Sequence, residues 1–195
     1  TPVQDIMEPI LLSEGKYWGI GMDIDGPEIL LAGYHHKLNT GSSNENTAVF
    51  MAMSESPTKS TDWIINPQVV GGLDVVSGGT DPVAVGMGEE DGHILYQDTR
   101  NDTTGLDRLG LWYSHGLPEQ TSWSYRKAVG DYAFAPVISV SEISNEDIIV
   151  ASWGEGYDQS SELVTMVVDS SFSPIGEGEV RTASRGLGYI QLLET

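Results

Sequence analysis

GIGMDIDGPEILLAGY (residues 19–34), VAVGMGEEDGHILYQD (83–98) and PVISVSEISNEDIIVASW (136–153) are built alike: each is an apolar run, an acidic turn and a second apolar run. A polar connection and a third apolar run follow each of them, in TAVFMAMS (47–54), LGLWYSHG (109–116) and LVTMVVDS (163–170). A fourth, weaker run closes each unit, in WIINPQVV (63–70), WSYRKAV (123–129) and GEVRTAS (178–184). Gly, Pro, Asn and Ser interrupt these short runs, which favours strands over helices. Four short strands repeated in order are typical of the blades of a β-propeller.

The repeat predicts an all-β fold, a propeller-like array of about three four-stranded antiparallel blades in a single domain that takes in the whole chain. We expect the blades over residues 16–72, 80–130 and 131–184. Segments 1–15 and 185–195 are then terminal strands that close the ring or pair between chains.

Three blades leave the array open, because closed propellers have about four to eight. The outer faces of the first and last blades would be bare, and bare apolar sheet faces drive association. We therefore expect a homo-oligomer, such as two chains that form one ring, or contact with other subunits of a larger assembly. A small ring closed by the terminal strands is the alternative.

The chain is strongly acidic, with 29 Asp and Glu against 9 Lys and Arg and a formal net charge of −20. Its apolar patterning is too regular for a disordered acidic tail. A folded domain with this much like charge repels itself unless salt screens it, and the Debye length falls to about 3 Å at 1 M salt. The composition predicts adaptation to a high-salt environment, with an ordinary acidic secreted or surface domain as the alternative.

The same composition argues against several classes of protein. No basic stripe is present to neutralise phosphates, so we expect no nucleic acid partner. The sequence has no cysteine, which excludes disulfides, thiolate metal sites and a cysteine nucleophile. No apolar run is long enough to cross a bilayer and TPVQDIMEPILL (1–12) lacks the pattern of a signal peptide, so no membrane insertion is expected.

Two connections between third and fourth runs, SESPTKSTDW (54–63) and SHGLPEQTSW (114–123), align without a gap. The matching residues are Ser54, Thr61 and Trp63 in one and Ser114, Thr121 and Trp123 in the other. This pattern resembles the Asp-box, or BNR, hairpin of sialidase-like propellers, in which Ser and Asp side chains tie a turn and a closing Trp packs between blades. The turn here is longer, and the third unit, DSSFSPIGEGEV (169–180), has no Trp. The resemblance implies a propeller fold and a structural repeat turn at the six matching residues.

Sialidases of this architecture bind the substrate carboxylate with an arginine triad and use a tyrosine nucleophile and an acid/base residue. The spacing of the arginines here assigns no such triad, so no catalytic residue is predicted. Arg100 and Arg108 lie in one long connection, where they can meet an anionic ligand. Pairing with some of the many carboxylates is the alternative.

Exposed aromatic residues offer a binding hypothesis, because sugars stack on flat rings while nearby carboxylates and amides hydrogen-bond the sugar hydroxyls. Tyr34, Trp112, Trp153 and Tyr157 lie near strand ends beside the long connections. With the two arginines, these four residues form the predicted ligand-binding set. Core packing between blades is the alternative for each Trp.

Asp23 and Asp25 resemble a fragment of an oxygen-ligand calcium loop, but the further ligands of such a loop are missing. A plain acidic turn is the alternative. The four histidines, His35, His36, His93 and His115, would form a metal site only if folding happened to bring them together. We expect no cofactor, with Ca²⁺ at the two aspartates as the one metal hypothesis.

Together these features predict a non-catalytic recognition or assembly protein, located on a virion or an extracellular surface. A tail, baseplate or fibre component of a virus of a halophile, in contact with host-surface glycans, is the specific hypothesis, and it rests on composition and fold analogy. A propeller-type glycoside hydrolase or lyase, completed by oligomerisation, is the second hypothesis. A purely structural scaffold is the third.

Overall fold

The computed structural model describes residues 16–37, 46–55, 57, 60–70, 82–98, 110–120, 123–156, 161–176 and 180–184. Twelve strands in these segments form three four-stranded antiparallel sheets. The first sheet runs β1 (Lys16–Asp25), β2 (Glu28–Lys37), β3 (Asn46–Ser54) and β4 (Ile64–Val70), with a short 3-10 turn, η1 (Ser60–Asp62), before β4. The second runs β5 (Ala84–Met87), β6 (Gly92–Asp98), β7 (Gly110–Gly116) and β8 (Ser124–Asp131). The third runs β9 (Ala133–Ile143), β10 (Glu146–Glu155), β11 (Ser161–Asp169) and β12 (Val180–Ser184). The predicted all-β array of three four-stranded antiparallel sheets is confirmed.

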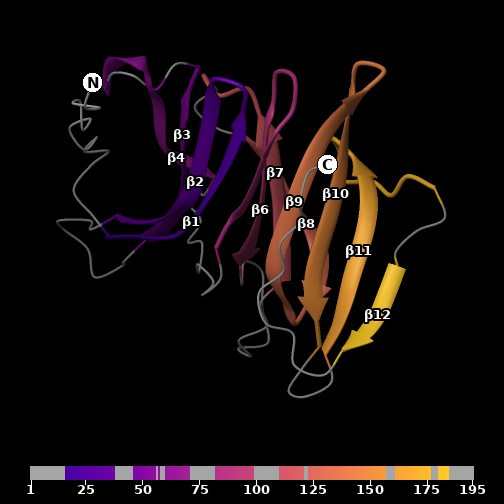
Figure 1. Ribbon diagram of the computed structural model, residues 1–195. Coiled ribbons are helices and arrows are strands. Elements are labelled where there is room, and N and C mark those ends of the chain that lie inside the picture. The colour runs from indigo at the N-terminus through magenta and orange to yellow at the C-terminus, as the bar shows by residue number, and fades with distance from the viewer. Residues whose placement is uncertain are drawn as a thin grey trace, which may run out of the picture.

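The sheets stand face to face in chain order, with the second sheet between the other two (Figure 1). Their first strands lie nearest one another, because β5 contacts both β1 and β9. The backbone N–H of Val83 donates to the Gly19 carbonyl at 2.8 Å and ties the start of the second sheet to β1. Meander sheets stacked with their first strands together are the arrangement of consecutive propeller blades. The predicted terminal strands, 1–15 and 185–195, lie outside the described residues.

Alternation along the strands creates two apolar layers, which we call the first and second joints. The first joint, between sheets one and two, contains Leu30, Tyr34 and Met51 on one side and Ile94, Trp112 and Trp123 on the other. The second joint, between sheets two and three, contains Leu95, Leu111 and Tyr113 on one side and Ile149, Trp153 and Val164 on the other. The middle sheet is therefore covered on both faces along β5, β6 and β7, which are buried almost throughout, whereas its last strand, β8, is largely exposed.

Gln97 on β6 ties the middle sheet to both neighbours. Its backbone N–H donates to the Tyr34 hydroxyl at 2.9 Å, and that hydroxyl lies 3.2 Å from the Gln97 carbonyl, to which it donates. Its side-chain Nε2 donates to the Ala133 carbonyl of the third sheet at 3.1 Å. Buried polar groups need such partners, so these contacts fix the relative position of the three sheets.

Close approach of β1 to the second sheet requires glycine at position 21. A Cβ on Gly21 would lie 1.9 Å from the Val83 carbonyl oxygen, which is far inside contact distance. The two-residue turn between β9 and β10 has a different backbone requirement: it holds Ser144 and Asn145 at φ of 58° and 65°. Both values lie in the left-handed region that a type I′ hairpin demands.

Candidate functional site

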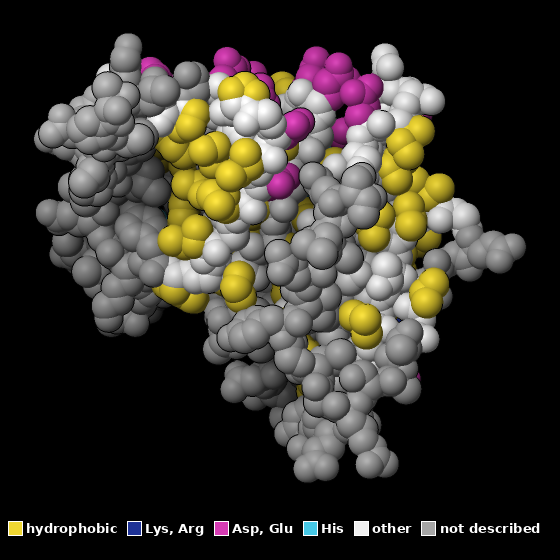
Figure 2. All heavy atoms as spheres, viewed as in Figure 1, with side chains coloured by type: hydrophobic (Ala, Val, Ile, Leu, Met, Phe, Trp, Pro, Cys, Tyr) yellow, Lys and Arg dark blue, Asp and Glu magenta, His cyan; other side chains and the backbone are white. Residues whose placement is uncertain are grey.

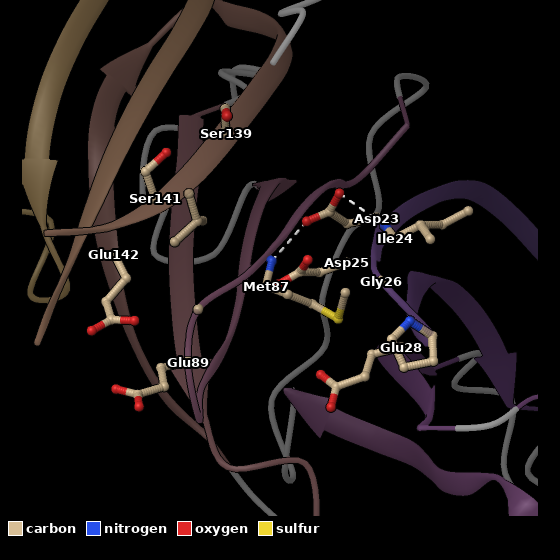
Figure 3. Close-up of a pocket in the computed structure, with 13 residues that line it drawn as sticks. Asp23, Ile24, Asp25, Gly26, Glu28, Met87, Glu89, Ser139, Ser141 and Glu142 are labelled. Atoms are coloured by element: carbon tan, nitrogen blue, oxygen red, sulfur yellow. Dashed lines mark hydrogen bonds between the residues drawn. The ribbon is translucent and has the colours of Figure 1, made fainter. Parts of the chain in front are cut away.

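At one end of the molecule, the turns that follow β1 and β5 and the last part of β9 surround a hollow of about 740 Å³, which we call the mouth. Residues of all three sheets line it, from the β1–β2 hairpin, the end of β5 with its turn, and β9 (Figure 3). Five carboxylates contribute, from Asp23, Asp25, Glu28, Glu89 and Glu142. Ser139 and Ser141 add hydroxyls from the third sheet.

Within the mouth, Asp23 already has partners. Its Oδ2 accepts a hydrogen bond from the Met87 backbone N–H at 2.8 Å, and its Oδ1 accepts one from the Ile24 backbone N–H at 2.9 Å (Figure 3). The carboxylate thus joins sheets one and two at the rim. Glu89 and Glu142 are exposed, which leaves their carboxylates open to solvent.

A second hollow, which we call the groove, lies between the first and second sheets at the same end and has a volume of about 770 Å³. Trp63 forms part of its wall and is half-buried. Six carboxylates surround it: those of Glu28, Glu55, Asp62, Glu89, Glu90 and Glu119. Glu28 and Glu89 also line the mouth, so the two hollows share a wall. Figure 2 shows acidic side chains gathered along this end of the molecule.

A third surface is apolar. Ile20, Met22 and Ile24 alternate along β1 and are 53%, 59% and 51% exposed. They lie on the face turned away from the second sheet, since Gly21 and Asp23 between them contact that sheet. We call these three residues the β1 row; hydrophobic side chains form a visible patch over the first sheet (Figure 2). On the third sheet, Val167 and Val180 are also exposed.

Three of the four predicted ligand-binding aromatics are buried, so their rings are not open to a ligand. Tyr34, Trp112 and Trp153 are 0%, 5% and 1% exposed and belong to the two joints. Tyr34 stacks on Trp18 with ring centroids 5.5 Å apart. The expectation that these rings are exposed is therefore wrong, and core packing, the alternative reading, describes them. The other members of that set, Tyr157, Arg100 and Arg108, lie outside the described residues.

The repeat-turn residues divide between core and surface. Trp123 packs in the first joint, and its Nε1 donates to the Leu117 carbonyl at 2.9 Å. The Ser114 hydroxyl donates to the Ser124 carbonyl at 2.6 Å, and Ser54 is equally buried. Trp63 instead lines the groove, and the Thr61 hydroxyl beside it donates to Asp62 Oδ1 at 3.2 Å. Thr121 lies outside the described residues.

For the metal hypothesis, the two aspartates share the rim of the mouth but form no ligand cluster. Within the described segments, no group of three or more His, Asp or Glu side chains is placed to hold a metal ion. His93 and His115 of the middle sheet stack with ring centroids 5.9 Å apart, with aspartates beside them, and His35 is buried on β2 of the first sheet. The side chain of His36 is not among those described.

Sequence reasoning missed the groove. Glu28, Glu89 and Trp63 each belong to a turn that was expected, but nothing local shows that turns of two different sheets enclose one hollow. The signal that could have found it is the repeat itself, because equivalent turns of consecutive blades emerge at one end.

Comparisons with known proteins add little. No protein-family model matches the chain, and no match was found among curated proteins. Among solved structures, the chain is similar to a family 117 glycoside hydrolase produced by the marine bacterium Zobellia galactanivorans, with 11% sequence identity and a TM-score of 0.48. The match covers 86% of this chain and 57% of that enzyme, so the chain spans little more than half its length. A likeness at this level assigns no activity.

Across the described residues, no helix has the length and apolar character needed to cross a membrane.

Proposed function

We propose that the protein is a non-catalytic recognition subunit that assembles with a second copy of itself and binds carbohydrate at the acidic end. The observation that carries the proposal is the groove, where a half-buried Trp63 stands among carboxylates and hydroxyls. A flat indole ring offers a stacking surface for a sugar, and the oxygen atoms around it accept hydrogen bonds from sugar hydroxyls.

The charge of the groove narrows the class of sugar. Six carboxylates repel an anionic ligand, and neither the groove nor the mouth contains Lys or Arg among its described lining residues. A sialic acid or uronic acid would therefore be rejected. A neutral sugar fits, and an amino sugar gains attraction both from the carboxylates and from the indole face.

Glycan-array binding tests the recognition step. The wild-type protein should bind neutral or amino sugars, and Trp63→Ala should remove that binding. Tyr125→Ala is the matched control, because Tyr125 is an exposed aromatic residue outside the groove. Equal binding by Trp63→Ala and the wild type would refute the groove as the binding site.

Assembly is supported by the β1 row. Each inner sheet face is covered by the next sheet, whereas this row is more than half exposed. The sheet stack continues naturally if the first sheet of one chain packs on the outer face of the third sheet of a second chain. Such head-to-tail contacts close a ring when the rotation allows it. The specific form of this proposal is a virion subunit that assembles through the β1 row and binds host-surface glycans at the groove in a high-salt environment.

Light scattering tests the assembly step. Met22→Lys puts a charge in the middle of the row and should halve the solution mass. Tyr125→Lys is the control, because it makes the same change of charge at an exposed residue of the middle sheet and should leave the solution mass unchanged. A monomeric wild-type protein, or a Met22→Lys variant with unchanged mass, contradicts this part of the proposal.

The mouth favours a second candidate function, a propeller-type glycoside hydrolase or lyase. Glu28, Glu89 and Glu142 reach this hollow from three different sheets, and glycoside hydrolysis uses a pair of carboxylates across the scissile bond. Hydrolysis of a chromogenic glycoside that is abolished by Glu89→Gln or Glu142→Gln would establish it. If the protein shows neither glycan binding nor glycoside turnover, the third hypothesis, a purely structural scaffold, is favoured.

A further inference from the structure

A buried chain of hydrogen bonds crosses the second joint. His93 on β6 is fully buried, and its Nε2 lies 3.0 Å from Asp147 Oδ2 on β10. Its Nδ1 lies 2.6 Å from the Tyr113 hydroxyl on β7. That hydroxyl also lies 2.9 Å from the carbonyl oxygen of Ser170, in the turn after β11. The chain Asp147–His93–Tyr113–Ser170 therefore attaches the middle sheet to the third sheet at two points.

The three contacts need three protons, but Tyr113 and a neutral His93 together supply only two. Tyr113 carries one hydroxyl proton and neutral His93 carries one ring proton. With that ring proton on Nε2, His93 donates to Asp147, the Tyr113 hydroxyl donates to Nδ1, and no proton is left for the Ser170 carbonyl. With the ring proton on Nδ1, the Nε2 lone pair would face the Asp147 carboxylate, which is repulsive.

An imidazolium at His93 completes the chain. Both ring nitrogens then donate, Nε2 to Asp147 and Nδ1 to the Tyr113 oxygen. The hydroxyl proton of Tyr113 is released from His93 and can be donated to Ser170. The charged ring and the Asp147 carboxylate form a buried ion pair, which strengthens the contact.

The surroundings of His93 set how readily it takes that proton. Burial is the largest influence and lowers the pKa of His93 below 6.5. The hydrogen bond and charge of Asp147 raise the pKa, as does the more distant Asp91, whereas the neighbouring His115 lowers it. His115 stacks on His93 at 5.9 Å, and its Nδ1 lies 3.3 Å from Asp91 Oδ2.

Tyr113 keeps its proton in both states. Burial raises the pKa of Tyr113, and the carboxylates of Asp91, Asp147 and Asp169 raise it further, while Arg126 acts in the opposite direction. The hydroxyl is therefore a donor at every pH at which His93 titrates.

We propose that the second joint is proton-coupled: when His93 takes up a proton, the Tyr113 hydroxyl turns from His93 to the Ser170 carbonyl, and the joint gains one hydrogen bond. The change is adjacent to the mouth, because Asp147 Oδ1 accepts a hydrogen bond from the Glu89 backbone N–H at 3.3 Å. Position 88 must be glycine for Asp147 to reach this turn, since a Cβ there would lie 2.2 Å from Oδ2.

Imidazole nitrogen NMR tests the proposal directly. At pH 8 we expect the His93 proton on Nε2, with Nδ1 as the acceptor, and a titration midpoint below 6.5. His115→Gln is the control, because it should leave the tautomer of His93 unchanged. A proton on Nδ1 at pH 8, or a midpoint at or above 6.5, would overturn the proposal.

Two variants separate proton coupling from a structural role. The Tyr113 hydroxyl donates to neutral His93 and accepts from the imidazolium, and the contact with the charged ring is the stronger of the two. Tyr113→Phe removes both contacts, so the titration midpoint of His93 should move lower. Asp147→Asn removes the negative charge that favours the imidazolium, so it should also lower the midpoint, and it serves if Tyr113→Phe does not fold. An unchanged midpoint in either folded variant refutes the chain of contacts.

Discussion

Tyr34→Phe removes a single oxygen atom from the first joint. The Tyr34 hydroxyl accepts from the Gln97 backbone N–H at 2.9 Å and donates to the Gln97 carbonyl at 3.2 Å, and Tyr34 is fully buried. Phenylalanine keeps the ring and its stacking on Trp18, so the polar contacts alone are lost. A buried polar group that loses its partner costs about 1–3 kcal/mol. We expect the free energy of unfolding to fall by about 2 kcal/mol, because water cannot replace the hydroxyl there.

Urea denaturation, followed by tryptophan fluorescence at constant high salt, measures that cost. For a chain of this size, a loss of about 2 kcal/mol corresponds to a thermal midpoint lower by about 4–8 °C. Tyr125→Phe is the matched control: Tyr125 is 43% exposed, so the same deletion should change stability by less than about 0.5 kcal/mol. If Tyr34→Phe were as stable as Tyr125→Phe, the hydroxyl would not be holding the first two sheets together.

Other substitutions and conditions test the remaining parts of the fold. Gly21→Ala should destabilise the protein by at least about 1–3 kcal/mol in urea denaturation, because its Cβ would meet the Val83 carbonyl, whereas Gly130→Ala has open space and should be near neutral. Ser144→Gly should raise the free energy of unfolding by about 0.5–1 kcal/mol, because glycine adopts a φ of 58° without the strain of a side chain; a lower stability would contradict the type I′ turn. His93→Gln should abolish part of the pH dependence of stability. Since burial lowers the pKa of His93, the unfolded chain binds a proton first, and the wild-type urea midpoint should fall as the pH drops below about 7 and level off below the folded-state pKa. The variant should lack that fall, and an identical pH profile would refute the linkage.

The fold could be predicted because its signals are local and repeated. The acidic turn in GMDIDGPEIL and the two later turns divide apolar runs of strand length, and the structure places β1–β2, β5–β6 and β9–β10 on those runs. Sheet order followed from the same repeat, because consecutive strands joined by short turns pair as antiparallel neighbours.

Burial could not be predicted in the same way, and the middle sheet shows why. Trp112 and Tyr113 are adjacent on β7 and point to opposite faces, yet both are buried, one in each joint. Alternation separates core from solvent only when one face of a sheet is solvated. A sheet that is covered on both faces carries no such contrast, so aromatic residues near its strand ends look as if they could face solvent.

The candidate site depended even more on long-range packing. Asp23 was expected to be a turn residue or a calcium ligand, but its carboxylate is held by the backbone of Met87 from the next sheet. His93 and Asp147 are 54 positions apart, and no local pattern joins them. Only the stacking of sheets two and three brings them within hydrogen-bond distance.

The net charge of −20 and the β1 row act against each other in any self-association, and salt decides the balance. Two copies repel through their carboxylates over a Debye length of about 10 Å at 0.1 M salt, which falls to about 3 Å at 1 M. Burial of Ile20, Met22 and Ile24 is favourable at both concentrations. Association through this row must therefore strengthen as salt is added, whereas an interface built on ion pairs would weaken. Solution mass measured across this range distinguishes the two: a dimer that dissociates on adding salt would exclude the β1 row as its main contact.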